Sequence, residues 1–128
     1  MMSLLYALAA LSAAQAAPDC RNPVTQADMN RCAALEFAAS DAQLNAAWPG
    51  VLAYARAQDQ ANRTTDNRQG AAARLLQAQR AWITFRDAHC TVESYQARGG
   101  SMEPLLYNTC RAHLTRQRVA QLHALQVE

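Results

Sequence analysis

Four cysteines in a chain of 128 residues constrain the fold of this sequence more than any other feature. An even number of cysteines in a short chain predicts a disulfide framework, which persists in oxidising compartments. The four are Cys20, Cys32, Cys90 and Cys110. We expect the pairs Cys20–Cys32 and Cys90–Cys110, because each pair closes a short loop that runs into a helix. A Cys32–Cys90 bridge is the main alternative, since antiparallel neighbouring helices could bring those two positions together.

The first 16 residues carry no charged side chain and contain an apolar run, Leu4 to Leu11, of signal-peptide length. Ala14-Gln15-Ala16 then has the small-x-small pattern of a cleavage site. We therefore predict a signal peptide over residues 1–16 and a mature domain over residues 17–128. The segment lacks the usual Lys or Arg near its start, so a buried N-terminal helix is the alternative. No lipid-attachment motif precedes Cys20, and we expect a periplasmic or secreted protein without a membrane anchor.

The first predicted helix begins at Thr25, whose hydroxyl can cap it within a Thr25-Gln26-Ala27-Asp28 capping box. Its apolar residues recur at helical spacing on one face; they are Met29, Ala33, Phe37, Leu44, Trp48 and Leu52. Proline removes an intrahelical hydrogen bond and clashes with the preceding turn. We therefore expect a kink or a break at Pro49-Gly50, with helix resuming as far as about Arg56.

A polar stretch from Gln58 to Gly70 predicts a connecting loop, and the next helix is predicted over residues 71–96. Its expected buried residues are Leu75, Leu76, Trp82, Ile83, Phe85 and Cys90. Gly99-Gly100 should end this helix, and Ser101 should cap a third one. The apolar stripe of the third helix consists of Leu106, Cys110, Leu114, Leu122 and Leu125.

Three amphipathic stretches with short connections predict an all-α fold, a small antiparallel bundle of three main helices held by two disulfides. The number of helices rises to four if the chain breaks near Pro49 or Thr115. An alanine-rich composition with only 6% aromatic residues favours closely packed helices over a sheet.

Charge and motif content exclude several functions. All 12 basic residues are arginine and 10 residues are acidic, so the net charge is +2, and no clustered basic stripe predicts nucleic-acid binding. No nucleophile elbow or phosphate-binding loop is present. We therefore expect no enzymatic activity, no catalytic residue and no cofactor. A zinc site could use His89, Cys90, Cys110 and His113, but an oxidising compartment favours disulfides, and we expect no metal.

Three blocks of sequence occur in an order that is typical of one bacterial family. The first comprises Thr25-Gln26-x-x-Met29-Asn30-x-Cys32-Ala33 and Asp41-x-x-Leu44-Asn45. The second is Gln79-Arg80-Ala81-Trp82-Ile83-x-Phe85-Arg86-Asp87-x-x-Cys90. The third comprises Gly99-Gly100-Ser101-Met102, Cys110 and Leu114-Thr115-x-x-Arg118. The chain thus resembles the LprI-type lysozyme-inhibitor family over nearly all of its mature length, although Trp48-Pro49-Gly50 departs from the continuous first helix of that family. The resemblance implies an exported helical domain and, for the family's namesake, inhibition of lysozyme.

Arg86 is expected on the buried side of the second helix, on the same face as Trp82. A buried arginine needs partners, and Asp41 and Asn45 on the first helix are the natural candidates. Together with Asp87, we interpret these residues as a structural network that fixes the packing of the helices. A carboxylate-binding role for Arg86 is the alternative interpretation.

The segment Gly99, Gly100, Ser101 and Met102 is a connection between helices, and it is also a candidate for binding a partner. A lysozyme cleft carries two carboxylates, which a serine hydroxyl and free backbone N–H groups could contact. We therefore predict a binding protein that occludes a lysozyme cleft without covalent chemistry. The alternative is an envelope interaction or stress protein that has another envelope protein as its partner and does not inhibit lysozyme.

Overall fold

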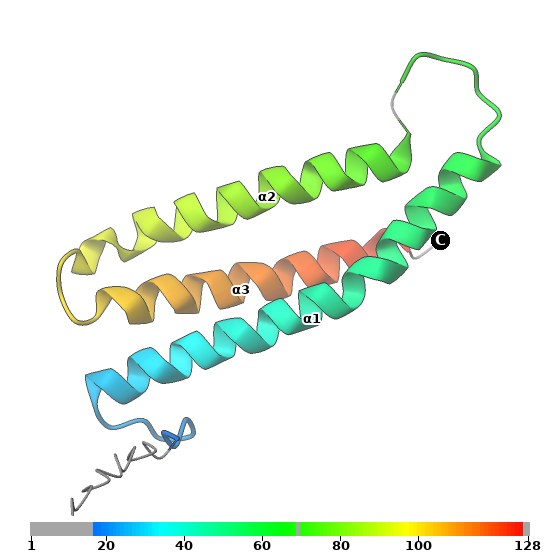
Figure 1. The fold of residues 1–128 in the computed structure, drawn as a ribbon. Coiled ribbons are helices and arrows are strands. Elements are labelled where there is room, and N and C mark those ends of the chain that lie inside the picture. The colour runs from blue at the N-terminus through cyan, green and yellow to red at the C-terminus, as the bar shows by residue number, and fades with distance from the viewer. Residues whose placement is uncertain (1–16, 69, 127–128) are drawn as a thin grey trace, which may run out of the picture.

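The computed structural model describes residues 17–68 and 70–126, and these residues form helices and connections without a strand. The elements are α1 (Gln26–Ala61), α2 (Ala71–Ser94), the short 3-10 helix η1 (Tyr95–Ala97) and α3 (Glu103–Ala124). α1 and α3 lie side by side in the same direction, and α2 runs in the opposite direction (Figure 1). The predicted bundle of three helices is confirmed. The predicted signal peptide, residues 1–16, lies outside the described residues.

α1 is one continuous helix that bends. Thr25 caps it as predicted, because its Oγ1 accepts a hydrogen bond from the backbone N–H of Asp28 at 3.0 Å. The expected kink or break at Pro49 takes the form of a kink, since the helix continues through this residue to Ala61. The kink is seen as a bend beyond the middle of the helix (Figure 1). Proline has no N–H to donate to the carbonyl four residues earlier, and bends of this kind commonly arise there.

The connection between α1 and α2 is shorter than the sequence suggests. α1 ends at Ala61, not near Arg56, and its last residues are exposed and polar. Asp59 in that last part caps α2: its Oδ1 and Oδ2 accept hydrogen bonds from the backbone N–H groups of Ala71 and Ala72 at 2.6 and 3.0 Å. The N-cap residue itself, Gly70, has no side chain to do so. The carboxylate of Asp59 therefore connects the end of α1 to the first turn of α2.

The connection between α2 and α3 is a tight turn. Gly99 adopts φ +76°, a conformation that glycine tolerates, as predicted for the end of the second helix. The predicted cap by Ser101 is wrong, because Met102 occupies the N-cap position and makes no side-chain cap bond. The alternative of a break near Thr115 is excluded, because α3 is continuous from Glu103 to Ala124. Thr115 is fully buried, and its hydroxyl oxygen accepts a hydrogen bond from Arg86. Its side chain is therefore used in helix packing and does not cap a new helix.

Both expected disulfides are present, and the Cys32–Cys90 alternative is wrong. Cys20–Cys32 ties the segment before α1 to the second turn of that helix, and Cys90–Cys110 joins α2 to α3. None of the described cysteines is free. The zinc hypothesis therefore loses both of its thiolate ligands.

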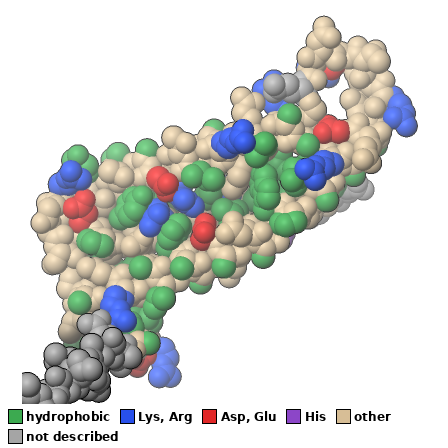
Figure 2. Space-filling view, viewed as in Figure 1, with side chains coloured by type: hydrophobic (Ala, Val, Ile, Leu, Met, Phe, Trp, Pro, Cys, Tyr) green, Lys and Arg blue, Asp and Glu red, His purple; other side chains and the backbone are tan. Residues whose placement is uncertain are grey.

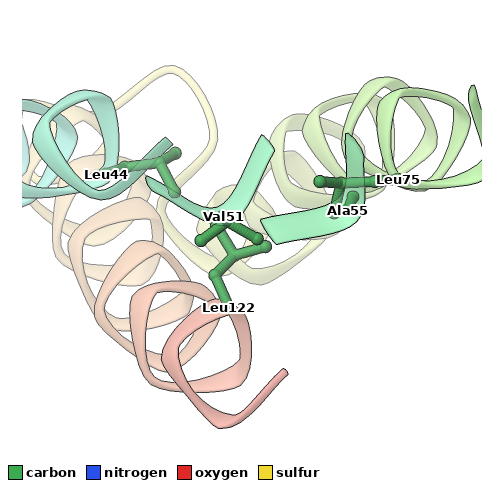
Figure 3. Packing of buried hydrophobic residues seen from close by; sticks show 5 residues of the cluster. All are labelled: Leu44, Val51, Ala55, Leu75 and Leu122. Carbon is green, nitrogen blue, oxygen red and sulfur yellow. The ribbon is translucent and has the colours of Figure 1, made fainter. Parts of the chain in front are cut away.

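A small apolar core lies in the half of the bundle that contains the bend of α1. It consists of Leu44, Val51, Ala55, Leu75 and Leu122, which come from all three helices. Val51 points toward Leu122, and Ala55 lies against Leu75 (Figure 3). Trp48, Leu52 and Val119 pack around this cluster.

The apolar side of α2 is only partly as predicted. Leu75 and Cys90 are buried, but Leu76, Ile83 and Phe85 are 39%, 40% and 55% exposed. The positions facing the other helices are taken instead by polar residues, namely Gln79, Arg86 and Ser94. Hydrophobicity alone does not predict which side of α2 is buried. A buried arginine needs polar partners, and some of those partners come from the other helices.

Candidate functional site

Arg86 lies at the centre of the half of the bundle that holds the Cys90–Cys110 bridge, and its side chain is only 7% exposed. Its Nε donates to Asp87 Oδ1 at 2.9 Å, and its Nη1 donates to Thr115 Oγ1 at 3.3 Å. Nη1 also lies 4.0 Å from Asp41 Oδ1. Asn45, the other expected partner, instead donates its side-chain amide to Asp41 Oδ2 at 3.4 Å. Two carboxylates and a hydroxyl therefore surround this guanidinium, as a structural role requires.

Aromatic rings flank the same guanidinium. The ring centroids of Phe37 and Trp82 each lie 5.1 Å from Arg86 Cζ. Trp82 also lies 5.9 Å from Cζ of Arg118, whose Nε donates to Gln79 Oε1 at 2.9 Å. Burial lowers the pKa of Arg118 from its ordinary value.

Arg111 is a third arginine in this interior, and sequence reasoning missed it. Its Cζ lies 3.8 Å from the ring centroid of Phe37 and 4.3 Å from that of Tyr107. Its Nη2 donates to Asn108 Oδ1 at 2.6 Å. Tyr107 and Arg111 are four residues apart on α3, the same spacing as Trp82 and Arg86 on α2. That repeated spacing is the signal that could have identified Arg111.

Rings and guanidinium groups alternate through the interior and join all three helices. We call this set the arginine–aromatic row; in order it contains Tyr107, Arg111, Phe37, Arg86, Trp82 and Arg118. On the face drawn in Figure 2, apolar side chains gather along the middle of the bundle, with basic and acidic side chains among them. Stacking of arginine on aromatic faces is favourable and needs a defined geometry. Arg86 is buried and the other members of the row are half-buried, so the row lies along the contacts between the three helices.

The segment Gly99–Met102 forms an exposed tip at the end of the bundle next to the row (Figure 1). The expectation of free N–H groups is wrong for two of its residues: Gly99 donates to Glu103 Oε2 at 2.8 Å, and Gly100 donates to the carbonyl of Ala97 at 2.9 Å. The carbonyl of Ser101 accepts a hydrogen bond from Asn30 Nδ2 of α1 at 2.8 Å. The tip is thus tied to two helices, while the side chains of Ser101 and Met102 remain exposed.

A cavity of about 510 Å³ lies beside this tip. Residues of α2, the tip and α3 line it; they are Thr91, Ser94, Arg98, Gly99, Gly100, Glu103, Pro104, Tyr107, Asn108 and Arg111. Arg98 Nη1 lies 3.4 Å from Glu103 Oε1, so these two opposite charges lie together at the cavity. The cavity therefore connects the tip to one end of the arginine–aromatic row.

Possible metal ligands lie together at one place in the described residues. Single ligand atoms of His89, Glu93 and Cys110 lie within 4.8 Å of one another. The sulfur of Cys110 is bonded to that of Cys90, which leaves one imidazole and one carboxylate. Two such groups on an exposed helix face are too few for a structural zinc site.

The outer face of α2 exposes several apolar side chains. Phe85 is 55% exposed and stacks on His89 with a centroid distance of 5.3 Å, and Val92 is 73% exposed. These three positions are spaced by four and three residues, so they share one side of the helix. In the part of the chain that the structure describes, no helix combines the length and the apolar character needed to cross a membrane.

The sequence profile of a family described as "Lysozyme inhibitor LprI" matches residues 19–122. The chain belongs to this family. The matched range includes both disulfides, the tip and the entire arginine–aromatic row, and it confirms the resemblance seen in the three sequence blocks. A protein of Rhizobium meliloti (strain 1021), described as uncharacterized, is 45% identical over 123 residues, covering 95% of this chain and 88% of the relative. No solved structure gives a significant match.

Proposed function

We propose that this LprI-family chain is an exported protein that inhibits a lysozyme by occupying its substrate cleft without covalent chemistry. Family membership supports the class of function. The two disulfides support export, because such bonds persist in oxidising compartments. The signal peptide over residues 1–16 and the periplasmic or secreted location are part of the proposal.

The observation that carries the proposed mechanism is the rigid, exposed tip Gly99–Met102. It lies within the segment that the Cys90–Cys110 bridge closes, turns at Gly99 and is held by Asn30 from α1. A segment that is already ordered loses little conformational entropy when a partner binds. Loops held on a stable scaffold are frequent sites of recognition.

The side chains near the tip suit a cleft that contains carboxylates. Lysozyme-type enzymes use two carboxylic acids in their cleft. Ser101 offers an exposed hydroxyl, and the adjacent Arg98 has a side chain that is 60% exposed. Among the described residues, the side chain of Arg98 contacts Glu103 at 3.4 Å and the ring of Tyr95, whose centroid lies 4.9 Å from its Cζ. In this proposal Arg98 exchanges its exposed contact with Glu103 for a carboxylate of the partner.

Long-range attraction contributes little in this proposal. The net charge is +2, which does not draw the chain toward a basic lysozyme. Of the acidic residues that could create a local negative surface, Glu36 lies 2.7 Å from Arg116 and Asp19 lies 3.3 Å from Arg21. Affinity must therefore come from short-range contacts at the tip.

A matched pair of tryptophan variants tests the proposed binding surface. Ser101→Trp places a bulky side chain on the tip, and Thr65→Trp does the same on the exposed connection at the opposite end of the bundle. Both oxidised proteins would be titrated into a cell-wall turbidity assay with the lysozyme that the unchanged chain inhibits. We expect Ser101→Trp to lose inhibition and Thr65→Trp to retain it. Full inhibition by Ser101→Trp would refute the tip as the binding surface.

A second candidate function is favoured by the exposed side of α2. Phe85 and Val92 are apolar and mostly exposed, as expected for a protein that binds another envelope protein through this helix. If this second function is correct, Val92→Asp abolishes binding of the envelope partner, and neither the unchanged chain nor the variant inhibits lysozyme. If the chain protects cell walls from lysozyme equally well with and without Val92→Asp, this result supports the tip as the binding surface.

A further inference from the structure

Arg111 differs from Arg86 in the partners of its charge. Arg86 has two carboxylates around it, whereas no carboxylate lies within ion-pair distance of Arg111 among the described residues. Its one hydrogen-bond partner there is the side-chain oxygen of Asn108. The Nε atom of Arg111 is buried and has no hydrogen-bond partner in the described structure. A partly buried arginine normally has an anion or several acceptors around it, so this guanidinium is under-satisfied.

The position of Arg111 is nonetheless well defined. Phe37 and Tyr107 approach its guanidinium at 3.8 and 4.3 Å, measured from Cζ to each ring centroid. Stacking on rings occupies the faces of a guanidinium and leaves the N–H groups at its edge for hydrogen bonds. A planar donor fork of this kind matches the geometry of a carboxylate. Arg111 is therefore held in place by two rings and Asn108, without a carboxylate partner among the described residues.

The cavity beside the tip gives a small molecule access to this arginine. Arg111 is among its lining residues, together with the side chains of Thr91, Tyr107 and Asn108, which carry hydroxyl or amide groups. The opposite charges of Arg98 and Glu103 lie close together and largely cancel. The charge that remains in the cavity is the positive charge of Arg111.

We propose that this cavity binds a small hydroxylated organic carboxylate, of the size of a sugar acid. The carboxylate pairs with the outer N–H groups of Arg111, and the hydroxyls of the ligand bond to Tyr107, Asn108 and Thr91. The proposal does not depend on lysozyme inhibition, since it concerns the interior side of the tip rather than its exposed side chains.

The test uses glucuronate and glucose as probes, because they differ mainly in one carboxylate. Each would be titrated into the isotope-labelled, oxidised protein while the amide resonances of Gly99 and Gly100 and the Nε–H resonance of Arg111 are followed. We expect saturable shifts with glucuronate, with a dissociation constant in the millimolar range, and none with glucose. Equal shifts with both sugars, or none with glucuronate, would overturn the proposal.

Two variants identify the residue responsible. Asn108→Asp preserves the shape of the side chain and places a carboxylate 2.6 Å from Arg111 Nη2, where it competes with the ligand. Arg111→Met keeps an unbranched apolar stem between the two rings and removes the charge. We expect each to weaken glucuronate binding by more than about tenfold, a change of about 1.4 kcal/mol. Unchanged affinity in a folded Asn108→Asp protein, verified by circular dichroism, would contradict the assignment.

Discussion

Individual residues in this chain matter most where a charge is buried. Arg86 connects α2 to α1 through Asp41 and to α3 through Thr115, and it also pairs with Asp87 on its own helix. The carboxylates of Asp41 and Asp87 are 42% exposed, so removing Arg86 costs less than the about 3–5 kcal/mol that is typical of a fully buried ion pair. A domain of this size has a total stability of only about 5–15 kcal/mol. The row thus contributes to stability, although apolar patterning selects only Phe37 and Trp82 among its members and none of its arginines.

We predict that Arg86→Ala unfolds the domain or lowers its melting temperature severely. The reason is that Asp41 and Thr115 would lose their buried partner. Thermal circular dichroism measures the effect, and Arg21→Ala is the matched control, because Arg21 pairs with Asp19 at a highly exposed position. The control should melt like the unchanged protein. A folded Arg86→Ala variant with an unchanged melting temperature would mean that this arginine serves a ligand instead.

Features of single residues that follow from helical spacing could be predicted from the sequence, whereas a cap formed across a connection could not. The burial of Arg86 follows from its place on the buried side of a helix. The role of Asp59 could not be foreseen, because it caps a helix across a connection, 12 residues away from the N–H of Ala71 that it contacts. The stacking of Arg111 on Tyr107 could have been predicted from their four-residue spacing, whereas its contact with Phe37 of α1 depends on how the helices pack.

Capping groups determine where the helices begin, and one proline bends α1. α2 lacks a capping side chain of its own, and Asp59 supplies both acceptors for its first N–H groups. We predict that Asp59→Ala destabilises the protein by about 1 kcal/mol, the usual effect of losing such a cap. Asp66→Ala is the control, because Asp66 pairs only with Arg68 in the exposed connection. Denaturant titration followed by circular dichroism distinguishes them. Equal stability of the two variants would refute the capping role.

Pro49 accounts for the bend of α1, and its replacement is informative. Proline in a helix interior is about 3 kcal/mol less favourable than alanine. Because Pro49 is exposed, Pro49→Ala should restore a hydrogen bond without opening a cavity, and we predict a higher melting temperature. A lower melting temperature would show that the bend is needed to pack Val51 against Leu122.

The length of α1 was underestimated for a related physical reason. The residues of α1 beyond Arg56 are alanine or polar and all are exposed, so the apolar spacing that predicts a buried helix is absent there. The helix persists because Gln58 donates to Tyr54 Oη at 2.8 Å and Asp59 anchors the next helix. Local bonds of this kind are hard to recognise from sequence alone.

The molecule as a whole combines a small apolar core, the arginine–aromatic row and two disulfides. Its fold class and cysteine pairing could be predicted, because both follow from helical spacing and short loops. The exposed side of α2 could not, because Phe85 and Ile83 look like core residues until the packing partners are known.

The two bridges should differ in their sensitivity to reductant. Cys90 is fully buried and Cys110 is 5% exposed, whereas Cys20 lies on the surface. We predict that mild dithiothreitol reduces Cys20–Cys32 first and Cys90–Cys110 only as the bundle unfolds. Alkylation followed by mass spectrometry of peptides measures the order. Simultaneous release of all four thiols in the folded protein would contradict it.

The most direct test of the central claim is the protection of cell walls by the oxidised chain that begins at Ala17, which contains all three helices and both bridges. It would be titrated against c-type, g-type and i-type lysozymes in a turbidity assay, with the reduced and alkylated chain as control. We predict stoichiometric protection against one class, lost on reduction. No protection at micromolar excess against any class would contradict the proposed function and would favour a partner bound by the apolar side of α2.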